Sequence, residues 1–200
     1  MAVKIFSIPR NIAILSEYWQ YWQYRYFIGS YWMRFYWCQH CTHNDNGRTD
    51  CPGAGSKTCT STYDNKAETV LTYPAYITNA GKLFAAKGAK VVVSSPTPNN
   101  PWETGAFLYT PSRFTTYSSA SATAIGSAAA FVDHGQYVAN IFRTLGATVV
   151  DAYYPNGHTH TSPVGADTVA KAFVKGLKCG GSALSRYVKN STGSIQGSCI

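Results

Sequence analysis

The sequence predicts an α/β fold built on a parallel sheet, and three observations carry this prediction. Val91-Val92-Val93 is a short apolar run of β-branched residues, which is typical of a strand buried on both faces. A helical pattern that stops at Gly88 precedes the run. Helix, glycine and buried strand in this order form half of a parallel α/β crossover. We therefore expect the segment 94–105 to leave the edge of the sheet where α/β proteins keep their ligand loops.

The other elements follow in order along the chain. The helix before Gly88 has one apolar face, made of Tyr73, Ile77, Ala80 and Phe84. A helix weakened by Ser, Thr and Gly is expected over 112–128, a brief strand at 131–132 and a helix over 136–145 that ends at Gly146. We find neither an internal repeat nor an interdomain linker.

The last predicted helix follows a loop that carries two histidines, His158 and His160. Ser162 suits the N-cap and Pro163 the first helical position, because proline lacks the N–H that is unpaired there. The apolar stripe that follows predicts a buried face, made of Ala166, Val169, Ala170, Phe173, Val174 and Leu177. A loop held by such a helix is a suitable place for a general base. The alternative is a polar loop whose histidines only bond the backbone.

Length and charge set limits on the class of protein. The chain has 200 residues, which suits one domain with a sizeable core. Its net charge of +8 comes from 17 Lys and Arg against 9 Asp and Glu. These basic residues are scattered without a run, so we expect no nucleic-acid partner. An anionic polysaccharide suits the charge, and so does a solvated basic surface without any partner.

Residues 1–45 differ from the rest of the chain. Twelve of the twenty residues from 18 to 37 are aromatic, without helical or strand periodicity. Arg25 and Arg34 argue against a membrane-spanning helix, and residues 11–15 are too short and too weakly apolar for a signal peptide. We interpret 1–45 as sequence that was not selected to fold, with an interfacial membrane segment as the alternative. The domain is expected over 46–200.

The cysteines suggest two local disulfides. Cys51 and Cys59 bracket one short segment rich in Gly, Ser or Thr, and Cys179 and Cys199 bracket another, as in many secreted proteins. Asn190 lies in a glycosylation sequon, which matters only in a secretory compartment.

Two sets of residues suggest metal binding only weakly. The cluster at 38–43 fits no common zinc spacing, and His134, His158 and His160 have no evident carboxylate partner. We expect no metal and no other cofactor.

Two motifs and a loop identify a family. From residue 46 the chain resembles the fungal rhamnogalacturonan acetylesterases of the SGNH (GDSL-like) hydrolase superfamily. The segments that carry the resemblance are Asn-Gly-Arg-Thr-Asp-Cys at 46–51, Ser-Pro-Thr-Pro-Asn-Asn-Pro-Trp-Glu-Thr-Gly at 95–105, His-Thr-His-Thr-Ser-Pro at 158–163 and the paired downstream cysteines. The resemblance implies a flavodoxin-like three-layer α/β/α fold and a secreted, extracellular monomer that removes acetyl groups from pectic rhamnogalacturonan.

The catalytic residues of the family transfer unevenly to this chain. His160 matches the base, but three residues before it the family has Asp and this chain has Gly157. The nucleophile motif Gly-Asp-Ser of the first strand is absent, and Ser30, after Gly29, is its nearest echo. We therefore expect the sheet to lack its first strand or strands and a helix. Asn44 corresponds to an oxyanion donor, although Thr42 stands where the family has Gly.

The same resemblance suggests where a sugar is held and leaves two functions open. An aromatic face and amides suit a polyol, so Asn99, Asn100 and Trp102 are candidate substrate contacts, unless the tryptophan only packs its loop. One function is a carbohydrate esterase whose activity is impaired by the missing Ser motif and Asp. The other is a carbohydrate-binding relative that does not catalyse.

Overall fold

A three-stranded parallel sheet lies at the centre of the protein. The structure is a computed structural model that describes residues 12–15, 27–28, 31–32, 51–63, 65–189 and 191–200. The strands are β1 (Ile12–Leu15), β6 (Lys90–Ser94) and β7 (Ala129–Val132), in the order β1-β6-β7. Both pairs run parallel, with Ala13 opposite Val91 and Val91 opposite Ala129. The predicted α/β class with a parallel sheet is therefore confirmed.

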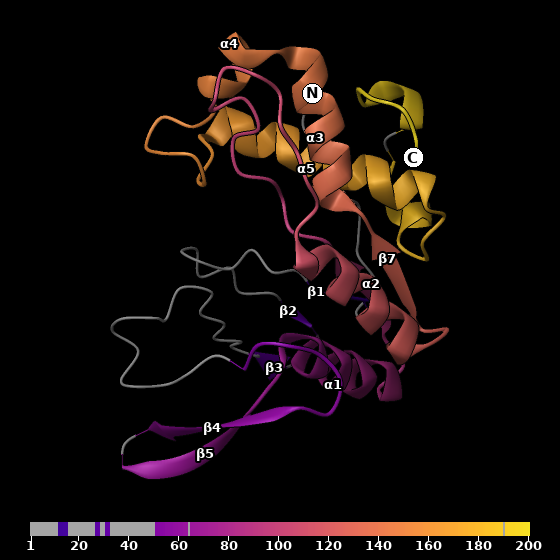
Figure 1. Cartoon of the computed structure of the whole chain (residues 1–200). Coiled ribbons are helices and arrows are strands. Elements are labelled where there is room, and N and C mark those ends of the chain that lie inside the picture. Colours follow the sequence, from indigo (N-terminus) through magenta and orange to yellow (C-terminus); the bar gives the residue numbers. More distant parts are fainter. Residues whose placement is uncertain (1–11, 16–26, 29–30, 33–50, 64, 190) are drawn as a thin grey trace.

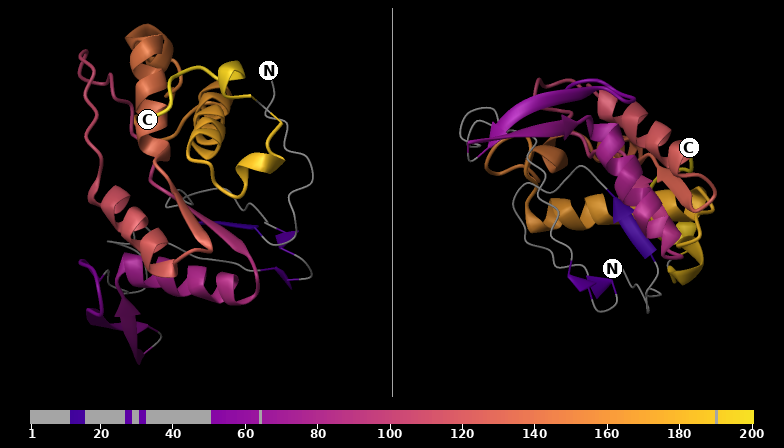
Figure 2. Two further views of the ribbon diagram at one scale, coloured as in Figure 1. Left: turned by 90° about the vertical axis from the view of Figure 1, so that its right-hand side faces the viewer. Right: turned by 90° about the horizontal axis from the view of Figure 1, so that it is seen from below.

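Helices cover both faces of this sheet (Figures 1 and 2). They are α1 (Tyr73–Ala86), α2 (Arg113–Ile125), α3 (His134–Leu145), α4 (Ala147–Asp151) and α5 (Pro163–Cys179). Val91 and Val93 pack with Phe84 of α1 and Ala122 of α2. Val92 points the other way and packs with Val174 and Leu177 of α5. Successive residues of a strand face opposite sides, so this central strand is buried on both faces and separates two helical layers.

One strand of the sheet comes from the N-terminal segment. β1 lies within residues 1–45, which the sequence assigned to a region outside the domain, and its backbone pairs with β6 from Lys90 to Val93. The sheet thus has a strand at an edge where we expected none. Ile12-Ala13-Ile14-Leu15 is apolar and partly β-branched, and the unpaired edge of a buried strand favours such a partner.

Two antiparallel pairs lie outside the parallel sheet. The first joins β2 (Phe27–Ile28) to β3 (Tyr31–Trp32). The second joins β4 (Thr58–Tyr63) to β5 (Lys66–Leu71), and this hairpin projects from the rest of the protein (Figure 1). Two short 3₁₀ helices, η1 (Ser185–Tyr187) and η2 (Thr192–Ser194), follow α5.

Helix α5 buries most of the predicted stripe, since Val174 and Leu177 are buried and Val169 and Phe173 pack against the core, but the buried face is shifted from the one predicted. Its N-cap is confirmed, since the Ser162 side chain accepts a bond from the Gly165 N–H. Ala166 and Ala170 are exposed, however, whereas Ala172 and Gly176 are buried. A Cβ on Gly176 would stand 2.6 Å from Cγ1 of Val132. The close approach of the helix to β7 therefore depends on a residue without a side chain, which a search for large apolar residues passes over.

A polar joint connects the carboxyl ends of β6 and β7. Ser95, which is fully buried, follows β6, and Asp133 follows β7. The Ser95 hydroxyl donates to Oδ1 of Asp133 at 2.8 Å and accepts from the Gly135 N–H at 2.9 Å. The same carboxylate oxygen accepts from the Gln136 N–H at 3.3 Å. Two amides of the first turn of α3 are thereby satisfied.

Replacing Gly135 with Ala tests how tightly this joint is packed. A Cβ there would lie 2.3 Å from the Pro96 carbonyl oxygen and 2.6 Å from the Tyr109 hydroxyl. At an unhindered helix position, replacing glycine with alanine stabilises the protein by about 0.5–1 kcal/mol. A loss of stability in this variant would therefore be due to the steric clash. We expect Gly135→Ala to lower the free energy of unfolding by about 1–3 kcal/mol in urea titrations. Gly193→Ala, where a Cβ meets nothing within 4 Å, is the control, and equal effects would contradict the prediction.

The two predicted disulfides are present. Cys51 bonds Cys59 at the base of the hairpin, and Cys179, at the end of α5, bonds Cys199. The second bond fastens the C-terminal segment, whose Ile200 N–H also donates to the Tyr137 hydroxyl at 3.3 Å.

Removing each disulfide should destabilise the fold according to the length of chain that it closes. The sequence separations are 20 residues for Cys179–Cys199 and 8 for Cys51–Cys59. Loop-closure entropy then gives losses of about 3 and about 2.5 kcal/mol for the paired Cys→Ala variants. Unfolding titrations measure the loss, and non-reducing peptide mapping checks the pairing. A peptide that links any of these four cysteines to Cys38 or Cys41 would overturn it.

Candidate active site

Two loops meet beyond the carboxyl edge of the sheet. The first loop (residues 95–112) follows β6, and the second loop (residues 152–162) joins α4 to α5. Three hydrogen bonds tie the two loops and the end of α4 together. The Tyr154 hydroxyl donates to the Pro98 carbonyl at 3.1 Å, the Asn100 N–H donates to the His158 carbonyl at 2.7 Å, and Nδ2 of Asn100 donates to Asp151 at 2.7 Å.

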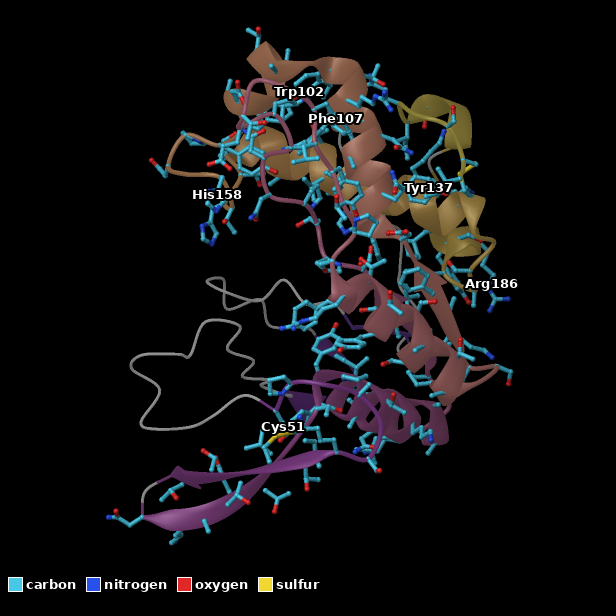
Figure 3. The ribbon with its side chains drawn as sticks, in the orientation of Figure 1. Cys51, Trp102, Phe107, Tyr137, His158 and Arg186 are labelled. Carbon is cyan, nitrogen blue, oxygen red and sulfur yellow. A yellow bond between two sulfur atoms is a disulfide. The ribbon has the colours of Figure 1, made fainter. Side chains whose placement is uncertain are left out.

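A carboxylate and an imidazole also meet across the loops. Nδ1 of His158 lies 3.0 Å from Oε1 of Glu103, and the two side chains are 51% and 57% exposed. Figure 3 shows His158 on the loop between α4 and α5. Both the backbone and the side chain of this residue are therefore held by the first loop.

The candidate sugar contacts separate into two groups. Trp102 packs against the core cluster around Phe142, and its indole N–H donates to the Phe142 carbonyl at 3.0 Å. The Asn100 side chain donates to Asp151 and accepts from the Trp102 N–H. Asn99 is exposed. This geometry favours the packing interpretation of Trp102 and leaves Asn99 with its side chain toward solvent.

The predicted base, His160, is exposed on the second loop, two residues beyond His158. Gly157, where the family has Asp, has φ +135°, a backbone conformation that L side chains rarely adopt. Two carboxylates near the carboxyl edge of the sheet have partners of their own: Asp133 accepts from Ser95, and Asp151 accepts from Asn100.

The predicted nucleophile and oxyanion donor, Ser30 and Asn44, lie outside the residues that the structure describes. Ser95 lies at the carboxyl edge of the sheet, where a nucleophile is expected. Its hydroxyl is buried and donates to the Asp133 carboxylate, however, so Ser95 belongs to the polar joint. Within the described ranges no group of three or more His, Cys, Asp and Glu is placed to hold a metal ion. No helix in those ranges is both long and apolar enough to span a membrane.

Burial shifts the pKa values of two side chains near the joint, His134 and Tyr109. Nε2 of His134 donates to the Val169 carbonyl of α5 at 2.8 Å, and the ring lies edge-on to Phe173. Burial lowers the pKa of His134 to about 4, against the opposing effects of that carbonyl and of Asp133. Burial and the Asp133 charge raise the pKa of Tyr109 to about 12. At neutral pH both side chains are therefore uncharged.

Sequence reasoning did not predict Glu103 as the partner of His158 or Asp133 as the partner of Ser95. Asp133 was detectable in principle, because an Asp between a short strand and a helix suits an N-cap. The pairing of Glu103 with His158 spans 55 residues and depends on how two loops fold over one another. No local pattern reports such a pair.

The pKa of His134 predicts a loss of stability in mild acid. Its ordinary pKa is 6.5 and its folded value about 4, so between these values the unfolded chain binds a proton that the folded chain does not. Stability therefore falls as pH drops through this window, by on the order of 2–3 kcal/mol in total. Urea unfolding at pH 7 and pH 4.5 measures this. His134→Gln should reduce the pH dependence and the exposed His158→Gln should not; equal curves for all three proteins would contradict it.

Comparison with known proteins identifies a relative. No family model matches the chain. A rhamnogalacturonan acetylesterase from Emericella nidulans is 52% identical over 157 residues, which are 78% of this chain and 62% of that protein. The chain thus spans slightly less than two thirds of its relative's length. Over those residues it is a relative of a fungal rhamnogalacturonan acetylesterase, which confirms the resemblance that its motifs indicated.

Proposed function

We propose that this chain binds acetylated pectic rhamnogalacturonan and hydrolyses its acetyl esters slowly. The relative that is 52% identical bears the name rhamnogalacturonan acetylesterase, and the histidine loop retained here is held at the carboxyl edge of the sheet by three bonds. That retained and anchored loop is the observation on which the proposal rests. The two disulfides fit a secreted, extracellular protein.

His160 stands at the position of the family's general base, and the family-type reaction through it is the one that the graft described below restores. Serine-type ester hydrolysis needs a hydroxyl nucleophile, an imidazole that takes its proton and donors for the oxyanion. A carboxylate must also orient the imidazole, and its loss in a serine protease lowers kcat by about 10⁴. Because position 157 is Gly, His160 lacks the carboxylate that the family places there. We therefore expect the family-type route through His160 to contribute little in the unmodified chain.

The partner is an anionic polysaccharide in this proposal. The net charge of +8 favours association with the galacturonate units of pectin. Asn99 is the sugar contact that the geometry leaves available, since its side chain is exposed on the first loop. The protein acts as a monomer on this substrate.

A carbohydrate-binding relative without catalysis is the second candidate. Gly157 favours it directly, because a binding protein has no use for the orienting carboxylate. The two functions separate by measurement. Binding to the polysaccharide with no acetate release supports the second, and any release above the uncatalysed rate supports the first.

Restoring the family residues should raise activity only when they are restored together. Catalytic groups of a triad act as a unit, and Gly157→Asp also forces a side chain onto φ +135°. We expect Gly157→Asp alone to leave acetate release near that of the unmodified chain. Replacing residues 1–45 by the N-terminal part of the Emericella relative, together with Gly157→Asp, should raise it by roughly 10³-fold or more. Acetate release from acetylated rhamnogalacturonan is the measurement.

Two controls accompany this graft. His160→Ala in the active graft should abolish the gain, because it removes the base that the restored carboxylate orients. Ser30→Ala in the unmodified chain should change little. Rapid turnover by the unmodified chain that is lost in Ser30→Ala would make Ser30 the nucleophile and would overturn our interpretation of residues 1–45.

A further inference from the structure

His158 has a carboxylate partner, Glu103, on the neighbouring loop. Its Nδ1 lies 3.0 Å from a Glu103 carboxylate oxygen, and its carbonyl accepts from the Asn100 N–H at 2.7 Å. The imidazole is thus oriented at the ring and at the backbone by residues of the first loop. Asn100 is itself tied to Asp151 and to the Trp102 N–H. Such double support keeps a catalytic side chain in one geometry.

The contact with Glu103 decides which ring nitrogen carries the proton. A carboxylate can only accept, so in the neutral imidazole Nδ1 holds the hydrogen and Nε2 keeps a lone pair. This is the tautomer that a general base requires. With the ring half exposed, Nε2 is accessible to water and to a polymer that lies across the two loops.

We propose that the slow ester hydrolysis of this chain runs through His158 as general base, with Glu103 orienting its ring. The proposal rests on the proposed function for its substrate, an acetyl ester of a polysaccharide. It requires no serine: water is the nucleophile. His158 is the catalytic residue, and Glu103 is a positioning residue.

The step balances without a further reactant. Nε2 of His158 takes a proton from water as the water oxygen bonds to the acetyl carbon. Collapse of the tetrahedral adduct breaks the bond to the sugar oxygen, which takes the proton back from the imidazolium. The products are the free sugar hydroxyl and acetic acid, which loses its proton to solvent.

The buried histidine of the described part of the chain, His134, does not fit this role. Nε2 of His134 is committed to the Val169 carbonyl, and burial lowers the pKa of that ring to about 4. His160 follows a glycine where its orienting carboxylate should be. Water screens an exposed pair such as Glu103–His158, so its contribution should stay near the lower end of what a positioned base provides, roughly ten- to a hundredfold.

Substitutions of the two residues in the full chain test the proposal. His158→Gln should lower kcat for acetate release roughly tenfold or more with little change in KM, and Glu103→Gln should lower it by a smaller factor. Added imidazole should restore part of the rate to His158→Ala, which a structural role would not produce. Asp167→Asn is the matched control, because it breaks another exposed ion pair, with Lys171 on α5, and should leave the rate unchanged.

The outcomes separate this inference from the proposed function. An unchanged rate in His158→Gln, or no rescue by imidazole, overturns the role of His158 while ester hydrolysis stands. An unmodified chain without acetate release, beside a graft that is active, also overturns it and leaves the family-type function intact. Loss of polysaccharide binding and of acetate release in both proteins would refute the two proposals together.

Discussion

The hydrogen bond between Ser95 and Asp133 holds the edge of the sheet on which both loops stand. It joins the ends of β6 and β7, and the same two side chains satisfy amides at the start of α3. Its geometry requires that position 135 have no Cβ, because the Pro96 carbonyl and the Tyr109 hydroxyl occupy that space. Since buried polar groups are costly when unpaired, this joint fixes where the first loop leaves the sheet and where α3 begins.

The second loop takes its position from contacts that are weaker one by one. Its ends are set by α4 and by the Ser162 cap of α5, while Tyr154, His158 and Asn100 fasten its middle to the first loop. Exposed polar contacts contribute little individually. Together with Trp102, which packs against the core, these contacts hold the loop that carries the two histidines in place.

One position that differs from the family pattern lies beside the two histidines of the second loop. With Gly at 157 the backbone adopts a φ of +135°, which an Asp would adopt only with strain. His158, the next residue, has a carboxylate partner in Glu103 on the neighbouring loop. The relative that is 52% identical shows which scaffold this chain resembles, and Gly157 is a position at which the chain departs from the family pattern.

Local sequence determined the class of fold, most of the helices and the disulfides. A run of three valines after a helix and a glycine, a Ser-Pro helix start and Cys pairs separated by 8 and 20 residues are features of short stretches of chain, so they can be recognised in the sequence alone. Three features were decided only by tertiary structure. The strand β1 pairs with β6 across more than seventy residues of chain, the buried face of α5 follows the close approach at Gly176, and Glu103 meets His158 across two loops. Each depends on what another element offers, an open strand edge, a neighbouring surface or a facing charge, and such partners are not encoded by any local periodicity.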